Sequence, residues 1–124
     1  MDETQAKQIR EALSRHRADF RGVLWQPRRL AQTNTVALIM EVVKGLVSEV
    51  KGLPLDDLPT SSKLRRYQHD VTIAYEKVKR NRLYNQAEFF AQVGVVFNLA
   101  SKVFEELARL ERMGYFDPNI AQEN

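Results

Sequence analysis

Hydrophobic residues recur along this chain at spacings of three and four positions, in four separate stretches. That spacing places apolar side chains along one side of an α-helix. The stretches predict helices over about residues 4–20, 35–51, 62–82 and 86–113. A short helical piece or loop after Pro27 lies between the first two. We therefore expect an all-α fold, a four- to five-helix bundle in a single domain over residues 1–124, with a flexible tail at about 117–124.

The first two helices have clear apolar stripes and recognisable ends. The stripe of the first helix consists of Ile9, Leu13, His16 and Phe20. That of the second consists of Val36, Ile39, Met40, Val43, Leu46, Val47 and Val50. Thr33 or Asn34 is suited to cap the second helix, and Gly52 to end it. Residues 52–61 form a linker with two prolines, whose three leucines predict that it packs across the bundle.

The third and fourth helices differ in how far their apolar positions extend. The stripe of the third helix consists of Leu64, Tyr67, Val71, Ala74, Tyr75 and Val78, and we expect Ser61 or Ser62 to cap it. The fourth is apolar nearly all round from Phe89 to Phe104, which predicts burial on several sides. Gly94 in its middle costs about 1 kcal/mol against alanine, and a close helix crossing would account for it. Gly114 is expected to end this helix.

The fourth helix also raises the expectation of self-association or of docking on other protein subunits. It has more apolar positions than a bundle of this size readily buries, and Phe89, Val95 or Phe97 are candidates to face another subunit. The simpler interpretation is that it is the central helix of the bundle. The sequence leaves both interpretations open.

Composition excludes several classes of protein. The chain has no cysteine, which excludes a disulfide framework, a thiolate metal site and a cysteine nucleophile. Its first residues are acidic and polar, unlike a signal peptide. The longest run without a charge, Phe89 to Ser101, is thirteen residues, whereas a membrane span needs about 20. We therefore expect a soluble, cytoplasmic protein with no membrane partner.

Positive charge is concentrated in one element. The formal net charge is +3 at pH 7, yet residues 63–87 hold seven Lys/Arg against two Asp/Glu. Along a helix about 30 Å long, such cations can track the phosphates of a nucleic-acid backbone. The candidate binding residues are Lys63, Arg65, Arg66, Lys77, Arg80 and Arg82. A solvated face with cations favouring the helix dipole would explain the C-terminal group but not the first three, because the dipole disfavours cations at a helix start.

Arginines of the first helix form a second candidate patch. Arg10, Arg17 and Arg21 share one stripe, with Arg28 and Arg29 beyond it. Arg10 and His16 also have the Arg-x5-His spacing of one family of helical ribonucleases, although Glu11 departs from that motif. Because His16 lies on the apolar stripe, we interpret it as a core residue. No pair of histidines has metal-ligand spacing, and no phosphate-binding loop or nucleophile elbow occurs. We therefore expect no catalytic activity, no metal and no cofactor.

The start of the third helix reads Leu58-Pro59-Thr60-Ser61-Ser62-Lys63-Leu64-Arg65-Arg66-Tyr67. This segment resembles the Thr-Ser-[Gln/Lys]-[Leu/Ile]-Arg segment of the small helical subunits of type III (Csm-type) CRISPR–Cas effector complexes. The matching positions are Lys63, Arg65 and Arg66, within about 20 of the 124 residues. The resemblance implies a non-catalytic subunit, several copies of which stack along an antiviral complex and line the path of the guide–target duplex.

The leading functional hypothesis is therefore a helical subunit that binds an RNA or DNA backbone within a multi-subunit complex. The alternative is a helical adaptor or inhibitor, phage- or plasmid-encoded, that docks on an acidic protein surface. Charge favours either partner. No base-reading motif is present, so the hypothesis includes no sequence-specific recognition.

Overall fold

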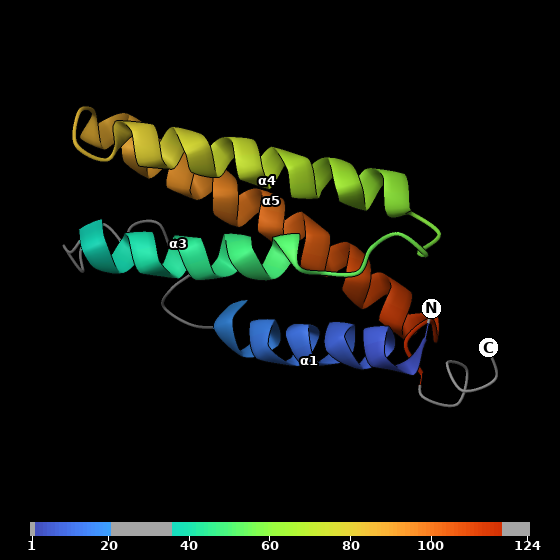
Figure 1. Ribbon diagram of the computed structural model, residues 1–124. Coiled ribbons are helices and arrows are strands. Elements are labelled where there is room, and N and C mark those ends of the chain that lie inside the picture. The colour runs from blue at the N-terminus through green and yellow to red at the C-terminus, as the bar shows by residue number, and fades with distance from the viewer. Residues whose placement is uncertain (1, 21–35, 118–124) are drawn as a thin grey trace.

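The computed structural model describes residues 2–20 and 36–117, with the side chains of residues 16–20 outside the description. The described residues form four helices, which are α1 (Glu3–Phe20), α3 (Val36–Lys51), α4 (Ser61–Asn81) and α5 (Gln86–Arg112). Each described end lies within one residue of the end that the apolar spacing predicts. The all-α helical bundle is therefore confirmed (Figure 1). The proposed piece after Pro27, the caps at Thr33 or Asn34 and the tail from residue 118 lie outside the described residues.

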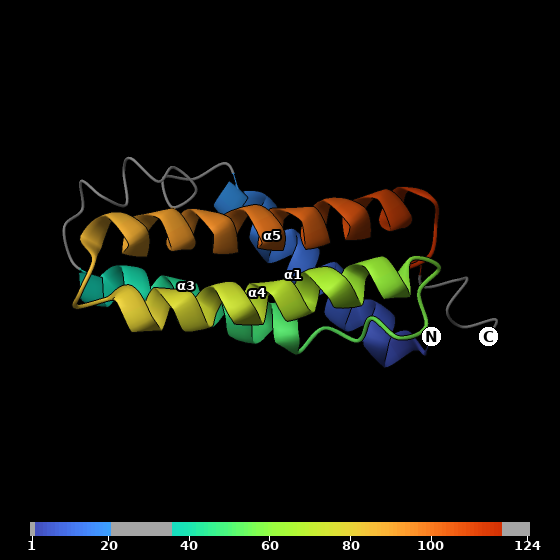
Figure 2. The same ribbon diagram turned by 90° about the horizontal axis from the view of Figure 1, so that it is seen from above.

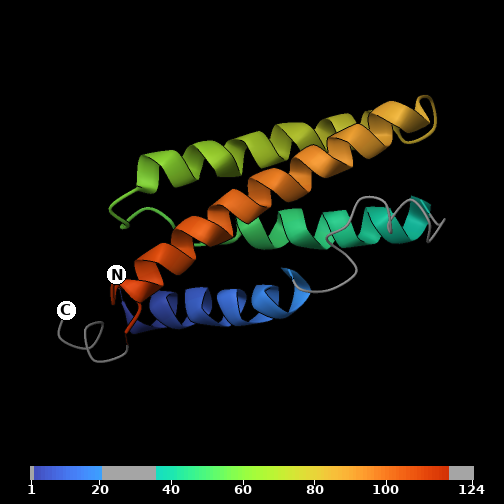
Figure 3. The ribbon, with the colours of Figure 1, turned by 180° about the vertical axis from the view of Figure 1, so that it is seen from behind.

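Successive helices alternate in direction, so that α1 and α4 run one way and α3 and α5 the other (Figure 1). From above, α4 and α5 lie side by side as an antiparallel pair (Figure 2). From behind, α5 crosses the bundle diagonally (Figure 3). It packs against each of the other three helices, and α3 also packs against α4. The result is a bundle organised around α5.

The core is built mainly on α5 and confirms the predicted stripes. Its buried apolar residues are Phe89, Val93, Val96, Phe97, Ala100, Val103, Phe104, Leu107 and Leu110. Burying each large side chain stabilises the fold by about 1.5–3 kcal/mol. Within the described helices only α5 is also long and apolar enough to cross a membrane, features that the core helix of a soluble protein shares. Its burial against three neighbours accounts for its apolar composition.

The linker between α3 and α4 packs into this core, as its leucines predict. Leu53, Leu55 and Leu58 are all buried, whereas Asp56 and Asp57 between them are exposed. α5 ends where expected, because Gly114 has a φ of 88° and its amide donates to the carbonyl of Glu111 at 3.0 Å. Glycine adopts this left-handed conformation without steric cost. The chain then turns back and buries Phe116 completely.

Two predictions about local contacts are wrong. Neither Ser61 nor Ser62 caps α4, because Thr60 is its N-cap residue and makes no side-chain cap hydrogen bond. Phe89 and Phe97 are not available to another subunit, since they are only 1% and 4% exposed and lie in the core. Their burial follows from the diagonal course of α5, which presents several of its sides to neighbouring helices. Val95 remains 40% exposed.

The close helix crossing expected at Gly94 is also absent. A Cβ atom built on Gly94 meets no atom of the described residues within 4 Å.

Since alanine favours a helix interior by about 1 kcal/mol over glycine, we expect Gly94→Ala to raise the free energy of unfolding by about that amount. Urea unfolding followed by circular dichroism measures it. The control is Gly114→Ala, which should lower the free energy of unfolding, because the Cβ atom of alanine makes the backbone strained at the positive φ of this position. A loss of stability in Gly94→Ala would contradict the open environment.

Candidate nucleic-acid interface

The six candidate cations of the α4 region separate into two groups. Arg66, Lys77, Arg80 and Arg82 are exposed, and no described carboxylate lies within 4.0 Å of their charged nitrogens. Arg66, Lys77 and Arg80 lie on the outward side of α4, opposite its buried stripe, over a length of about 21 Å. This outward ridge is therefore available to an anionic partner.

Lys63 and Arg65 have carboxylate partners within the chain. Lys63 Nζ lies 3.7 Å from Glu106 Oε2 on α5, and Arg65 Nη1 lies 2.9 Å from Asp56 Oδ1 of the linker. Both cations remain more than half exposed, so each ion pair contributes little to stability. These pairs nevertheless explain why two cations occur at a helix start. Their position alone is no longer evidence for a ligand.

A groove between α3 and α4 lies beside this ridge. Three surface hollows of about 370, 510 and 310 Å³ follow one another along the two helices. Lys44 and Tyr75 line both the first and the second, while Lys51 and Thr72 line both the second and the third. Because neighbouring hollows share these residues, they form one continuous groove. We call it the α3–α4 groove.

Cations outnumber carboxylates along the α3–α4 groove. The cations are Lys44, Lys51, Arg65, Lys79 and Arg82, and the carboxylates are Glu41 and Glu76. Glu76 is engaged by Lys79, whose Nζ lies 2.8 Å from Glu76 Oε1. That hydrogen bond raises the pKa of Lys79 and keeps it charged. Lys44 and Lys51 have no ion pair with any described residue and project from α3 into the groove.

Sequence reasoning missed Lys44 and Lys51. They lie in residues 35–62, where four carboxylates outnumber the two lysines and the local net charge is −2. The negative net charge of this segment therefore hid the two lysines from an analysis based on charge per segment. The available signal was their spacing of seven, which places both lysines on one side of α3. Only the packing of α3 against α4 brings that side next to the basic residues of α4.

The groove also has an aromatic surface and a defined end. Tyr75 is partly buried and lines its middle, with Lys79 Nζ 4.8 Å from the ring centroid. At the end of α3, Gln68 donates from Nε2 to the carbonyl oxygens of Val50 and Lys51, at 2.8 and 3.2 Å. These bonds give further hydrogen bonds to carbonyl groups in the last turn of α3, which lack an intrahelical amide partner, and connect α3 to α4. The groove is therefore held by direct contacts between its two walls.

The predicted patch on α1 is only partly described. The guanidinium of Arg10 is half-buried and donates a hydrogen bond to the carbonyl oxygen of Phe116. Arg10 thus holds the turn after α5 against α1. The side chains of His16 and Arg17, and residues 21, 28 and 29, lie outside the described part of the chain. The structure therefore does not describe the predicted pairing of Arg10 with His16.

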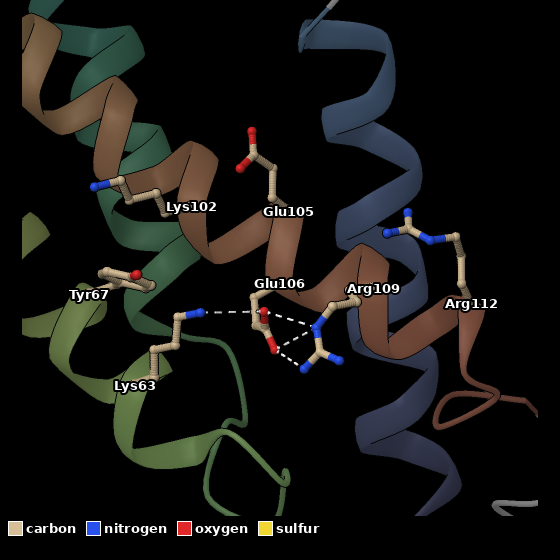
Figure 4. Close-up of a pocket in the computed structure, with 7 residues that line it drawn as sticks. All are labelled: Lys63, Tyr67, Lys102, Glu105, Glu106, Arg109 and Arg112. Carbon is tan, nitrogen blue, oxygen red and sulfur yellow. Dashed lines mark hydrogen bonds and ion pairs between the residues drawn. The ribbon is translucent and has the colours of Figure 1, made fainter.

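Glu106 is the one buried charged residue in the described part of the chain, at 8% exposure. Arg109 donates to both of its carboxylate oxygens (Figure 4). Thr60 donates from its hydroxyl to Oε1 at 3.0 Å. Hydrogen bonds from Arg109, assisted by the Thr60 hydroxyl and the charge of Lys63, lower the pKa of Glu106. The Thr60 contact explains why that hydroxyl does not cap α4. Glu106 thus joins the start of α4 to the second half of α5.

A shallow pocket of about 280 Å³ surrounds Glu106. Its lining consists of Lys63, Tyr67, Lys102, Glu105, Glu106, Arg109 and Arg112. The Tyr67 ring lies 6.0 Å from Lys63 Nζ and 5.8 Å from Lys102 Nζ. Glu105 points away from Glu106 (Figure 4). The buried carboxylate already has cationic and hydroxyl partners. We therefore assign the residues of this pocket a role in holding α4 against α5. The residues described contain no group of three or more His, Asp or Glu able to hold a metal ion.

Glu106→Gln tests the structural role of this carboxylate. Because folding lowers the pKa of Glu106 below its ordinary 4.5, its ionised form stabilises the protein above that pH, and this contribution is lost as the pH falls through the folded pKa. We expect the substitution to cost about 2 kcal/mol at neutral pH and to reduce the loss of stability in acid. Urea unfolding between about pH 3 and 7 measures both effects.

The neighbouring Glu105→Gln is the matched control, since it removes the same charge from an exposed side chain that points away from the cluster. It should change the free energy of unfolding by less than about 0.5 kcal/mol. Equal effects of the two substitutions would contradict the role assigned to Glu106.

Comparison of the chain with protein-family models, with curated proteins and with solved structures finds no match. The interpretation of the α3–α4 groove therefore depends on its own geometry and charge.

Proposed function

We propose that this protein is a non-catalytic helical subunit that binds the sugar–phosphate backbone of a nucleic acid, as one component of a multi-subunit complex. The observation that carries the proposal is the continuous α3–α4 groove. It is lined by five cations from α3, α4 and the turn that follows α4, and one of them, Arg65, is paired with Asp56 of the linker. The outward ridge of α4 extends the same basic surface.

The dimensions of the groove suit a polyanion better than a small anion. Its lining runs from Ala37 to Lys51 along α3, a distance of about 21 Å at 1.5 Å per residue. Successive phosphates of one strand are separated by only a few ångströms along a helix axis, so several fit over this length. Distributed lysines and arginines without base-reading partners support backbone binding that is independent of sequence.

The chemistry of the described residues supports a binding role. The carboxylate whose pKa is shifted, Glu106, has its hydrogen-bonding capacity engaged by Arg109 and Thr60. The cations of the groove, in contrast, lie at an open surface. Such a surface favours association through charge rather than a reaction at an enclosed centre.

We also propose that this chain acts as the small helical subunits of type III CRISPR–Cas complexes do, because residues 58–67 resemble a segment of those subunits. Within that segment, Lys63 and Arg65 have carboxylate partners, whereas Arg66 has none among the described residues. Contact with a guide–target duplex would then be made by Arg66 together with the rest of the outward ridge. Val95, exposed on α5, is the position retained for contact with neighbouring subunits.

The proposal predicts that Lys44→Gln with Lys51→Gln weakens nucleic-acid binding. Each phosphate contact contributes about −0.7 to the log–log dependence of affinity on salt for single strands, so loss of two contacts should reduce that slope by about 1.4. Fluorescence anisotropy with a labelled oligonucleotide over a range of salt concentrations measures it.

The matched control is Lys7→Gln with Lys102→Gln, which makes the same change in charge and composition on α1 and α5. It should leave most of the affinity and slope intact. Equal loss in the two double variants would attribute binding to net charge and would contradict a groove. Absence of saturable binding in the unaltered protein, with tight binding to an acidic protein instead, would favour the adaptor hypothesis.

A further inference from the structure

The turn between α4 and α5 exposes two large apolar side chains. Leu83 is 83% exposed and Tyr84 is 88% exposed, whereas the next most exposed large apolar residue in the described part of the chain, Met113, is 58% exposed. Both lie at the tip of the helical hairpin, away from the core. Because neither side chain is buried, neither adds hydrophobic stabilisation to the folded chain.

The turn that presents them is held by specific hydrogen bonds. The amides of Tyr84 and Asn85 donate to the carbonyl of Asn81 at 3.3 and 3.1 Å, and Asn81 donates from Nδ2 to the carbonyl of Lys77 at 2.9 Å. The side chain of Asn85 caps α5 by accepting from the Glu88 amide at 3.1 Å. Two asparagines thus define the backbone on both sides, and the exposure of Tyr84 is a property of a well-defined turn.

This tip lies at one end of the α3–α4 groove. Arg82, which immediately precedes Leu83, lines the first hollow of the groove together with Lys44 and Tyr75. The hairpin turn and the beginning of α3 lie at the same end of the bundle in opposite views (Figures 1 and 3). Consequently, a strand whose phosphates follow the groove reaches the tip as it leaves the protein.

We propose that Tyr84 stacks on an unpaired base of a single-stranded nucleic acid whose backbone occupies the α3–α4 groove. This inference rests on the proposed function and names the class of ligand as single-stranded. The phenol ring supplies a flat face for any base, so stacking requires no sequence preference. Leu83 beside it provides apolar surface, and Arg80 and Arg82 supply positive charge for the adjoining phosphates. In a duplex, by contrast, the faces of interior bases are occupied by their neighbours.

The test compares two probes of about 16 nucleotides, the upper end of site sizes for single-strand-binding modules. One is oligothymidylate, and the other is the same backbone carrying abasic residues at every position. We expect Tyr84→Ala to weaken binding of oligothymidylate roughly 5- to 100-fold and to leave binding of the abasic strand unchanged. Tyr84→Phe keeps the aromatic face and should retain most of the affinity. Because Tyr84 is exposed, thermal unfolding should show the same stability for all three proteins.

Every result decides between the two proposals. If Tyr84→Ala binds oligothymidylate as tightly as the unaltered protein while Lys44→Gln with Lys51→Gln binds it weakly, stacking is wrong and the groove stands. Stacking on an unpaired base is also overturned if Tyr84→Ala weakens binding of oligothymidylate and of the abasic strand equally. The same conclusion follows if it weakens binding of oligothymidylate and of a blunt duplex equally. If neither variant weakens binding, the proposed function itself is wrong.

Discussion

The packing of α5 against all three other described helices is the constraint on which the rest of this structure depends. Large side chains such as Phe89, Phe104 and Leu107 are wholly or almost wholly buried on this one helix. Their burial determines which side of each neighbouring helix turns inward. The positions of Lys44 and Lys51 on α3, and of the basic residues on α4, follow from that choice because they occupy the remaining sides.

Glu106 adds a polar constraint to this apolar core. A buried carboxylate is costly unless its oxygens are paired, and here α4 supplies Lys63 while Thr60 and Arg109 complete the hydrogen bonding. Such a requirement is directional, unlike hydrophobic contact, and it favours one placement of α4 along α5. Since α4 is one wall of the groove, a contact on the far side of α4 contributes to the shape of the binding surface.

The fold could be predicted from sequence because each helix repeats a regular apolar pattern over at least four turns. The site could be predicted only in part. Arg66, Lys77 and Arg80 are exposed as expected, since they lie opposite the buried stripe of their own helix. Lys63 and Arg65 have partners 43 residues later and nine residues earlier, and helix periodicity contains no information about such pairs. The groove required the relative placement of α3 and α4, which only tertiary packing supplies.

The distinction between paired and unpaired cations also separates stability from binding. Lys44, Lys51 and Arg82 share the groove without ion-pair partners among the described carboxylates, so their mutual repulsion opposes the folded state of the free protein. Added salt screens this repulsion, and a bound polyanion removes it more completely. Added salt should therefore raise the free energy of unfolding of the free protein by screening the cations of the groove. The same salt should lower the affinity for a nucleic acid. The Glu106 carboxylate itself is buried and its charge is matched by Arg109 and Lys63, so its contribution responds less to salt. A surface whose charges disfavour the empty protein and favour the occupied one is the physical basis for assigning binding to the α3–α4 groove rather than to the pocket around Glu106.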